Sequence, residues 1–405
     1  MLLTVREQTF ITNHLTDDVR RLALQQAADV DLPKVVSQIQ ARQKARFKLP
    51  TWYANPALVF PPPLSVEQAS SEQTARYKAS LVADPQQTPE GRAHLIDLTG
   101  GMGVDAAAFA RQVGRVTYVE QQHQVAEAAA YNFGQLGLTN VTVQVGDGIT
   151  HLSNLTEPAD WLYLDPARRG THGGRVVGLA DCDPDVLTHL PRLLASGRQV
   201  LLKTSPLLDV DATLRQLPAC AAVHVVAVQG EVKELLFVVR SGTVPVAEVE
   251  MVAVNLRGDD PVRFVFGRSE EATALVRLAE PTIEPGTYLY EPNAAVLKAG
   301  AFRLVGARFG LAKLAPHSHL YTTDRLVPDF PGRVFQIDAV CKADRKALLT
   351  HVPGGQANLT VRNFPQTVEA LRKQLHLREG GAVYIFATTL QNNEKRLIVS
   401  HKALP

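Results

Sequence analysis

The segment Asp97-Leu98-Thr99-Gly100-Gly101-Met102-Gly103 decides how the middle of this chain folds. It ends the apolar run 94–98 and precedes an alanine-rich stretch that starts at Val104. This order predicts a turn from a buried strand into a helix. Glycines in such a turn let the backbone pass close to a ligand, and the N-terminus of a helix favours polar or anionic groups. The segment therefore predicts a ligand site at the end of a strand.

Short apolar runs alternate with helical segments on both sides of this turn, between residues 91 and 242. The predicted strands are seven runs: HLIDL (94–98), RVTYVE (115–120), VTVQV (141–145), WLYLD (161–165), QVLLKT (199–204), AVHVVAV (222–228) and ELLFVVR (234–240). Helical segments between the first five predict a parallel sheet. Only Gln229–Lys233 joins the last two runs, which is too short for a parallel return, so the final strand is expected to be antiparallel.

Acidic residues close the first four predicted strands. Asp97 and Glu120 end the first two, Asp147 follows the third, and Asp165 ends the fourth. Because the carboxyl ends of parallel strands meet at one edge of the sheet, we expect these four acids to converge on one crevice. Taken singly, each acid is equally typical of a solvated turn or a helix cap.

Two kinds of ligand fit this pattern. Gly101-x-Gly103-x-x-Ala106 satisfies a dinucleotide fingerprint, which leaves an NAD-dependent dehydrogenase open. The strand order, the acidic glycine loop and the final hairpin together resemble the class I, Rossmann-like S-adenosylmethionine-dependent methyltransferases, over residues 91–242. Dehydrogenase domains lack that hairpin. The resemblance implies a seven-stranded α/β sheet with S-adenosylmethionine as cofactor, held by Asp97, Thr99, Gly101, Gly103, Glu120, Asp147 and Asp165. Thr99 stands where the family has its first loop glycine.

The residues after the fourth strand resemble two acceptor motifs. One is the DPPY or NPPY tetrapeptide of amino-methylating enzymes, which implies that Asp165 and the carbonyl of Pro166 are the catalytic groups that hold an amine. Asp165–Arg168 is more similar to the DPPRAG-type sequence of RNA uridine-C5 methyltransferases. Those enzymes need a cysteine nucleophile after the fifth strand, where 203–206 contains none. We therefore expect methylation of a base nitrogen.

Four residues are candidates for substrate binding: Tyr77, Arg168, Arg169 and Lys203. A guanidinium group can stack on a base or hold a phosphate, although a solvated loop tip is an equally good interpretation of the arginine pair. Tyr77 lies between two cations just before the cofactor region and could line its entrance. Upstream, cations alternate near aromatic rings between Arg42 and Tyr53, a mixture suited to phosphates and unstacked bases or simply to a solvated helix end.

The flanking regions predict two further domains. Residues 1–90 are expected to be mainly helical, with helices separated by Pro33 and a capping box at Ser65 and Gln68. Residues 243–405 alternate strands with helices and end in a hairpin around 391–393, which predicts an α+β domain. Segments 291–298 and 360–365 resemble the THUMP-like domain of certain bacterial class I methyltransferases. THUMP domains proper bind RNA, so the resemblance implies an RNA partner.

Composition narrows the function classes. The net charge of +2, from 42 basic and 40 acidic residues, leaves polyanion binding to local patches. The sequence has no apolar run of the ~18–20 residues that span a bilayer and no signal-peptide pattern at its start, so we expect a cytoplasmic protein. Three cysteines without metal spacing argue against zinc and disulfides. We predict a methyltransferase acting on an RNA base nitrogen. Protein or small-molecule acceptors and a non-catalytic RNA-binding protein stay open, as does the oligomeric state.

Overall fold

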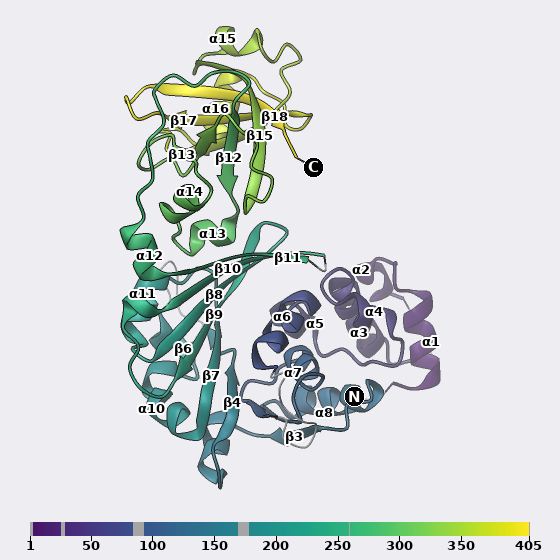
Figure 1. Ribbon diagram of the computed structural model, residues 1–405. Helices are drawn as coiled ribbons and strands as arrows, with labels where there is room; N and C mark the ends of the chain where they lie inside the picture. Colours follow the sequence, from purple (N-terminus) through teal and green to yellow (C-terminus); the bar gives the residue numbers. More distant parts are fainter. Residues whose placement is uncertain (1–2, 26–28, 84–92, 169–177, 259, 405) are drawn as a thin grey trace. The chain divides into compact units, whose positions relative to one another are not determined.

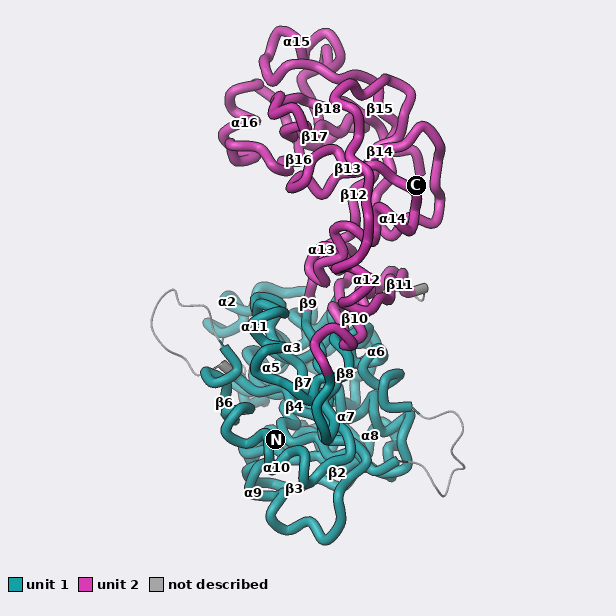
Figure 2. Tube along the Cα trace, turned by 60° about the vertical axis from the view of Figure 1, so that its left-hand side comes forward, with its two compact units in different colours: residues 1–223, 234–244 teal, residues 224–233, 245–405 magenta. Residues whose placement is uncertain are grey.

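The computed structural model describes residues 3–25, 29–83, 93–168, 178–258 and 260–404. The chain forms two compact units (Figure 2). The first comprises residues 1–223 and 234–244, and the second comprises residues 224–233 and 245–405. The domain boundaries expected from the sequence at residues 90 and 242 stay predictions.

The described residues before β1 form six helices: α1 (Val5–Asn13), α2 (Val19–Leu22), α3 (Leu32–Ala45), α4 (Pro50–Ala54), α5 (Pro63–Gln68) and α6 (Glu72–Val82). The two helices expected between residues 17 and 48 are present as α2 and α3, but Pro33 does not lie between them. It lies in the first turn of α3, where a missing backbone N–H costs no helical hydrogen bond. The capping box predicted at Ser65 is also wrong, because Pro63 already starts α5 and Ser65 lies inside it. The longer helix α6 is capped by Ser71, whose hydroxyl accepts a hydrogen bond of 3.2 Å from the N–H of Thr74.

All seven predicted strands are present: β1 (His94–Asp97), β2 (Arg115–Glu120), β3 (Val141–Val145), β4 (Ala159–Leu164), β7 (Gly197–Thr204), β8 (Cys220–Val228) and β9 (Glu231–Arg240). The first five pair in parallel, in the spatial order β3-β2-β1-β4-β7. β9 runs antiparallel to β7 and lies between β7 and β8. The predicted sheet with its reversed final strand is therefore confirmed.

Five helices connect these strands: α7 (Val104–Phe109), α8 (His123–Gln135), α9 (Gly148–His151), α10 (Val186–Ser196) and α11 (Val210–Gln216). Figure 1 shows α6, α7 and α8 on one side of the sheet and α10 and α11 on the other. A two-stranded ribbon of β5 (Ala167–Arg168) and β6 (Cys182–Asp183) follows the end of β4. The loops that carry the acids therefore leave the carboxyl edge of a sheet covered on both faces.

Two strands that the sequence suggested for the C-terminal module extend this same sheet. β10 (Glu250–Arg257) lies beside β8, and β11 (Asp260–Gly267) pairs antiparallel with β10, so the hydrogen-bonded sheet has nine strands. The N–H of Gln229 donates to the carbonyl of Leu256 over 3.1 Å. Periodicity predicted the strands but cannot tell which sheet a strand will join.

The second unit contains a seven-stranded sheet in the order β13-β14-β12-β15-β18-β17-β16. Its strands are β12 (Tyr288–Pro292), β13 (Ala312–Lys313), β14 (Tyr321–Thr323), β15 (Gly332–Lys342), β16 (Asn358–Arg362), β17 (Val383–Thr389) and β18 (Lys395–Lys402). Its helices are α12 (Arg268–Thr273), α13 (Ala294–Lys298), α14 (Leu304–Arg308), α15 (Arg345–Leu349) and α16 (Val368–Leu375). The expected hairpin of β17 and β18 is confirmed.

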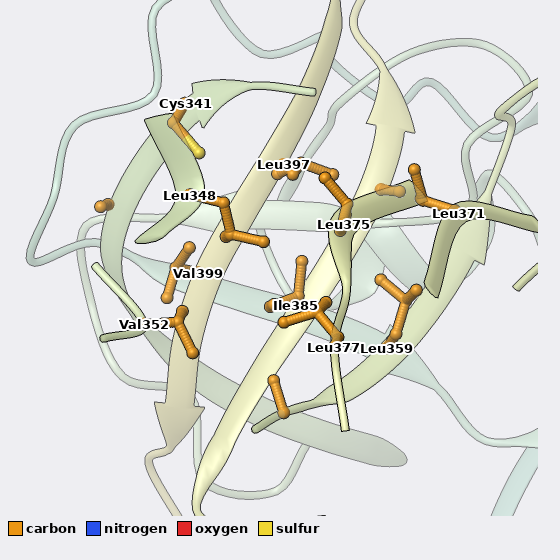
Figure 3. Packing of buried hydrophobic residues seen from close by; sticks show 13 residues of the cluster. Cys341, Leu348, Val352, Leu359, Leu371, Leu375, Leu377, Ile385, Leu397 and Val399 are labelled. Atoms are coloured by element: carbon orange, nitrogen blue, oxygen red, sulfur yellow. The ribbon is translucent and has the colours of Figure 1, made fainter. Parts of the chain in front are cut away.

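A buried apolar cluster holds α15 and α16 against this sheet (Figure 3). Leu371 and Leu375 of α16 are fully buried with Ile385 and Leu397 of the strands. At about 1.5–3 kcal/mol for each large apolar side chain removed from water, such burial is the main stabilising contribution to the unit. Within the described ranges, no helix is both long enough and apolar enough to cross a membrane.

Candidate active site

The loop between β1 and α7 requires glycine at three positions. A Cβ atom on Gly100 would lie 2.3 Å from Cε2 of Tyr118, and one on Gly103 would lie 2.8 Å from Cζ of Phe133. Gly101 and Gly103 have φ angles of 53° and 84°, in the left-handed region that glycine tolerates. The loop is thus packed closely against β2 and α8.

Two residues at the end of β2 fix this loop. The hydroxyl of Tyr118 donates a 2.5 Å hydrogen bond to the carbonyl of Gly101. One carboxylate oxygen of Glu120 accepts from the N–H of Gly101 over 2.8 Å, and the other accepts from the N–H of Gln122 over 2.8 Å. A carboxylate has about four lone-pair positions, so Glu120 keeps capacity for further donors such as ribose hydroxyls.

Asp97 presents a buried carboxyl oxygen without a protein partner. Its side chain is 1% exposed, and Oδ1 accepts from the N–H of Thr99 over 3.1 Å. Oδ2 is buried and has no hydrogen-bond partner among the residues that the structure describes. Burial raises the pKa of Asp97 well above its usual value, and the neighbouring acids Asp105, Asp165 and Glu120 add to this. An unsatisfied buried acceptor costs about 1–3 kcal/mol, so the site fits a ligand that brings a positively charged donor.

Asp147 closes the same edge of the sheet from β3. It caps α9 by accepting from the N–H of Thr150 over 2.7 Å, and it also accepts from Gln121 over 3.0 Å. Burial by itself raises the pKa of Asp147, but these hydrogen bonds outweigh it and lower the pKa below the usual value. A Cβ on Gly148 would lie 2.2 Å from the carbonyl oxygen of Leu98, so α9 starts directly against the end of β1.

Asp165 is held from both sides at the end of β4. Its backbone N–H donates to the hydroxyl of Thr99 over 2.7 Å, and its side chain forms an ion pair with Lys203 of β7. Burial alone lowers the pKa of Lys203, but Asp165, Glu234 and Asp105 outweigh it, so the pKa is raised and the ammonium stays charged. Pro166 follows, half-buried, before the short strand β5. The acceptor motif is therefore attached to the glycine loop.

Comparison with known proteins shows which proteins this chain is similar to. Three family models match: protein-L-isoaspartate (D-aspartate) O-methyltransferase at residues 33–165, a ferredoxin-like domain at 288–331, and a THUMP domain-like model at 332–402. A crystal structure from Porphyromonas gingivalis W83, of a protein assigned as a methyltransferase, is 32% identical. It covers 100% of both chains with a TM-score of 0.87. An uncharacterized S-adenosylmethionine-dependent methyltransferase of Mycobacterium tuberculosis is 27% identical over 327 residues, covering 80% of this chain and 83% of the relative.

The chain belongs to the S-adenosylmethionine-dependent methyltransferases with a C-terminal THUMP-like domain. S-adenosylmethionine is the cofactor of this methyltransferase, and the NAD-dependent dehydrogenase alternative is set aside. The unpartnered oxygen of Asp97 suits the ammonium group of the cofactor. Thr99, which replaces the first loop glycine, uses its hydroxyl to hold Asp165.

The methyltransferase also contains a buried polar cluster that the sequence did not reveal. Lys78 of α6 is 0% exposed, and its Nζ lies 3.0 Å from both carboxylate oxygens of Glu234, 2.9 Å from Oγ of Ser70 and 3.2 Å from Oδ1 of Asp105. Asp105 also accepts from Ser70 over 2.7 Å and from Tyr163 over 2.8 Å. This cluster connects α6 and α7 to β4 and β9, next to the Asp165–Lys203 pair.

The predicted substrate residues lie in different surroundings. Tyr77 is a residue of α6, and its side chain is 5% exposed. Its expected place at the site entrance stays a prediction. Arg168 belongs to β5, and Arg169 lies outside the described residues. Arg42, one of the cations near the upstream rings, is 3% exposed and is therefore neither a phosphate contact nor a solvated helix end. Its guanidinium group donates to the carbonyls of Tyr53, Asn55, Pro56 and Leu58.

Proposed function

We propose that this methyltransferase methylates a nitrogen atom of an RNA base, with Asp165 and Pro166 as the residues that hold the acceptor. The observation that supports this most directly is the 2.7 Å hydrogen bond from the N–H of Asp165 to Thr99. It fixes the acceptor motif to the cofactor loop. Two reactants held in one orientation react far faster than two free molecules, so such a fixed arrangement suits methyl transfer.

In this proposal the loop and the strand ends hold the cofactor. Asp97 accepts a hydrogen bond from its ammonium group through the oxygen that has no protein partner. Glu120 accepts from the ribose hydroxyls, and Asp147 accepts from the adenine amino group. Thr99, Gly101 and Gly103 shape the loop that lets the cofactor approach the backbone. S-adenosylmethionine supplies a methyl group that is already activated by its positively charged sulfur.

The acceptor is held by oxygen atoms at the end of β4. The Asp165 carboxylate accepts one N–H of the base, and the carbonyl of Pro166 accepts the other. Lys203 fixes the orientation of the Asp165 carboxylate through their ion pair. Because the donor is already activated, positioning supplies most of the acceleration, and the proton released by the nitrogen passes to solvent without a strong general base.

The proposal that the substrate is RNA rests on two features. The THUMP domain-like match at residues 332–402 favours an RNA partner, although it does not identify one. Three residues are the proposed contacts to the substrate: Arg168, which ends the acceptor motif, Arg169, which follows it, and Lys203. The segment 203–206 has no cysteine, which argues against the C5 chemistry of uridine methyltransferases.

Two measurements test the proposal. Mass spectrometry of nucleosides from cells with and without the gene should show one N-methylated nucleoside that disappears with the gene. In vitro, Asp165→Ala should bind S-adenosylhomocysteine like the wild type but lose methyl transfer to the responsible RNA. A nucleoside profile that does not change would refute the RNA target. Full turnover by Asp165→Ala would refute the assignment of Asp165 to the acceptor.

A protein carboxylate is a second candidate acceptor. The match to protein-L-isoaspartate (D-aspartate) O-methyltransferase favours it, but that match spans residues 33–165 and stops at the acceptor motif. It therefore covers the half of the domain that binds cofactor. Incubation with tritiated S-adenosylmethionine separates the two: methyl esters on protein release their label in mild base, whereas N-methylated bases keep it.

A further inference from the structure

The turn Arg46–Leu49, between α3 and α4, presents an aromatic ring to solvent. Phe47 is 89% exposed. Single exposed apolar side chains are common on protein surfaces, so exposure alone carries no argument. Here the guanidinium carbon of Arg46 also lies 5.3 Å from the centroid of the Phe47 ring. A flat ring and a cation therefore stand side by side on the surface.

Backbone hydrogen bonds and a buried side chain hold this turn in place. The N–H groups of Lys48 and Leu49 donate to the carbonyl of Ala45 over 3.0 and 2.7 Å, and Leu49 is fully buried. The carbonyl of Lys48 accepts from the N–H of Glu72, at the start of α6, over 3.1 Å. Since the backbone is already fixed, little conformational entropy is lost when the ring meets a ligand.

The side chain of Lys48, the residue after Phe47, is anchored to two backbone carbonyls. Its Nζ donates to the carbonyls of Val66 and Glu67 over 3.1 and 2.6 Å. An ammonium group has three N–H donors, so one remains for an anion. The turn thus offers one stacking surface and two cations, a combination that suits a nucleotide.

Contacts within the first unit connect this turn to the acceptor motif. Glu72 holds Lys48, and just before Glu72 the hydroxyl of Ser70 donates to Asp105 over 2.7 Å. Asp105 in turn binds the hydroxyl of Tyr163, two positions before Asp165. Electrostatics agree: burial and the charge of Lys203 lower the pKa of Lys48 to about 8, although Asp105 and Asp165 act to raise it. Lys48 therefore lies near the Asp165–Lys203 pair.

We propose that Phe47 stacks on an unpaired base next to the base that is methylated, while Arg46 and Lys48 contact the adjoining phosphates. This inference rests on the RNA substrate proposed above and assigns part of its recognition to the N-terminal helical region. Stacking of a base on an aromatic side chain does not depend on sequence, because every base has a π-face. The site therefore holds a single-stranded segment in place, and the acceptor pocket selects the base.

The test measures RNA affinity of the full chain with saturating S-adenosylhomocysteine. The probe is a fluorescein-labelled, single-stranded oligoribonucleotide of roughly 12 nucleotides and mixed sequence, followed by anisotropy. Phe47→Ala should weaken binding about 5- to 150-fold, and Phe47→Trp should keep it. Leu24→Ala is the matched control, because Leu24 is 86% exposed in the same helical region but has no aromatic ring that could stack on a base. It should leave affinity unchanged.

The outcomes separate the two proposals. If the wild type binds the probe and Phe47→Ala binds it equally well, the stacking site is refuted while the RNA substrate stands. If the wild type binds no RNA, the RNA substrate fails and the stacking site fails with it. An equal loss in Leu24→Ala would show a general disturbance of the helical region and would also overturn the assignment. Calorimetry of S-adenosylhomocysteine binding, expected to be the same in all variants, confirms that each is folded.

Discussion

The side-chain hydroxyl of Thr99 accepts a 2.7 Å hydrogen bond from the backbone N–H of Asp165. The two residues lie in different loops, one at the end of β1 and one at the end of β4, and β1 and β4 are neighbours in the sheet. A glycine at position 99 would leave this N–H without its partner. The threonine therefore joins the glycine loop to the motif that we propose receives the acceptor.

Replacing this hydroxyl should impair turnover more than cofactor binding. In Thr99→Val the shape is kept, but the N–H of Asp165 loses its acceptor, at a cost of about 1–3 kcal/mol. The acceptor motif should then shift, and kcat should fall ~10- to 100-fold, since small misplacements are costly in positional catalysis. Thr99→Ser should retain activity. The test compares the rate of methyl transfer from tritiated S-adenosylmethionine with the cofactor affinity measured by calorimetry. A Thr99→Val enzyme with normal kcat would show that the bond has no catalytic role.

Cofactor affinity should rise with pH because of Asp97. The pKa of Asp97 is raised, chiefly by burial, so the cofactor-free protein keeps this carboxyl protonated above its usual range. An ammonium ligand favours the ionised form, so binding must release a proton between the usual and the raised pKa. The same shift lowers stability as pH rises through that window, because the folded chain then binds more protons than the unfolded chain.

Calorimetry of S-adenosylhomocysteine binding across pH, in buffers with different ionisation enthalpies, measures this proton release. Asp97→Asn provides the control, because it keeps the shape but cannot titrate. It should bind more weakly and show no proton release from this position. Identical pH profiles for the two proteins would exclude Asp97 as the ammonium partner.

Local sequence patterns were sufficient to predict seven of the nine strands of the first sheet. A strand such as 115–120 carries its apolar alternation within a few residues, and a glycine such as Gly103 marks a turn wherever the chain folds. The link 229–233 is too short for a parallel return, which fixed the reversed final strand before any tertiary contact was known. The family assignment followed from this order of elements.

Polar partners across the fold could not be predicted in this way. Lys78 and Glu234 are 156 residues apart, and no pattern near Lys78 distinguishes a buried ammonium from a solvated one. Ser65 and Ser71 are equally good helix caps by local chemistry, and the choice depended on where Pro63 started the preceding helix. In each case packing in three dimensions decides between local alternatives of similar energy.

Removing the buried ammonium should strongly destabilise the first unit. Lys78→Met leaves Glu234 and Asp105 as buried carboxylates without their cation, and breaking a buried pair from one side costs about 3–5 kcal/mol. Lys44→Met is the matched control, because its ion pair with Glu67 is solvent-exposed and should cost ~1 kcal/mol or less. Urea unfolding followed by fluorescence gives both values. Equal losses in the two variants would mean that the cluster adds little to stability.

Arg42 should prove structural, in contrast to its neighbour Arg46. Its guanidinium group binds four backbone carbonyls of the segment 53–58, at distances from 2.6 to 3.3 Å, and lies over the Phe60 ring at 4.9 Å. Arg42→Met leaves these carbonyls unsatisfied, at about 1–3 kcal/mol for each that water cannot reach. The free energy of unfolding should therefore fall by several kcal/mol, on the order of the largest single-site effects. Arg46→Met, at an exposed position, should change it by ~0.5 kcal/mol or less. If Arg42→Met were as stable as Arg46→Met, the four hydrogen bonds could not be what fixes the segment 53–58.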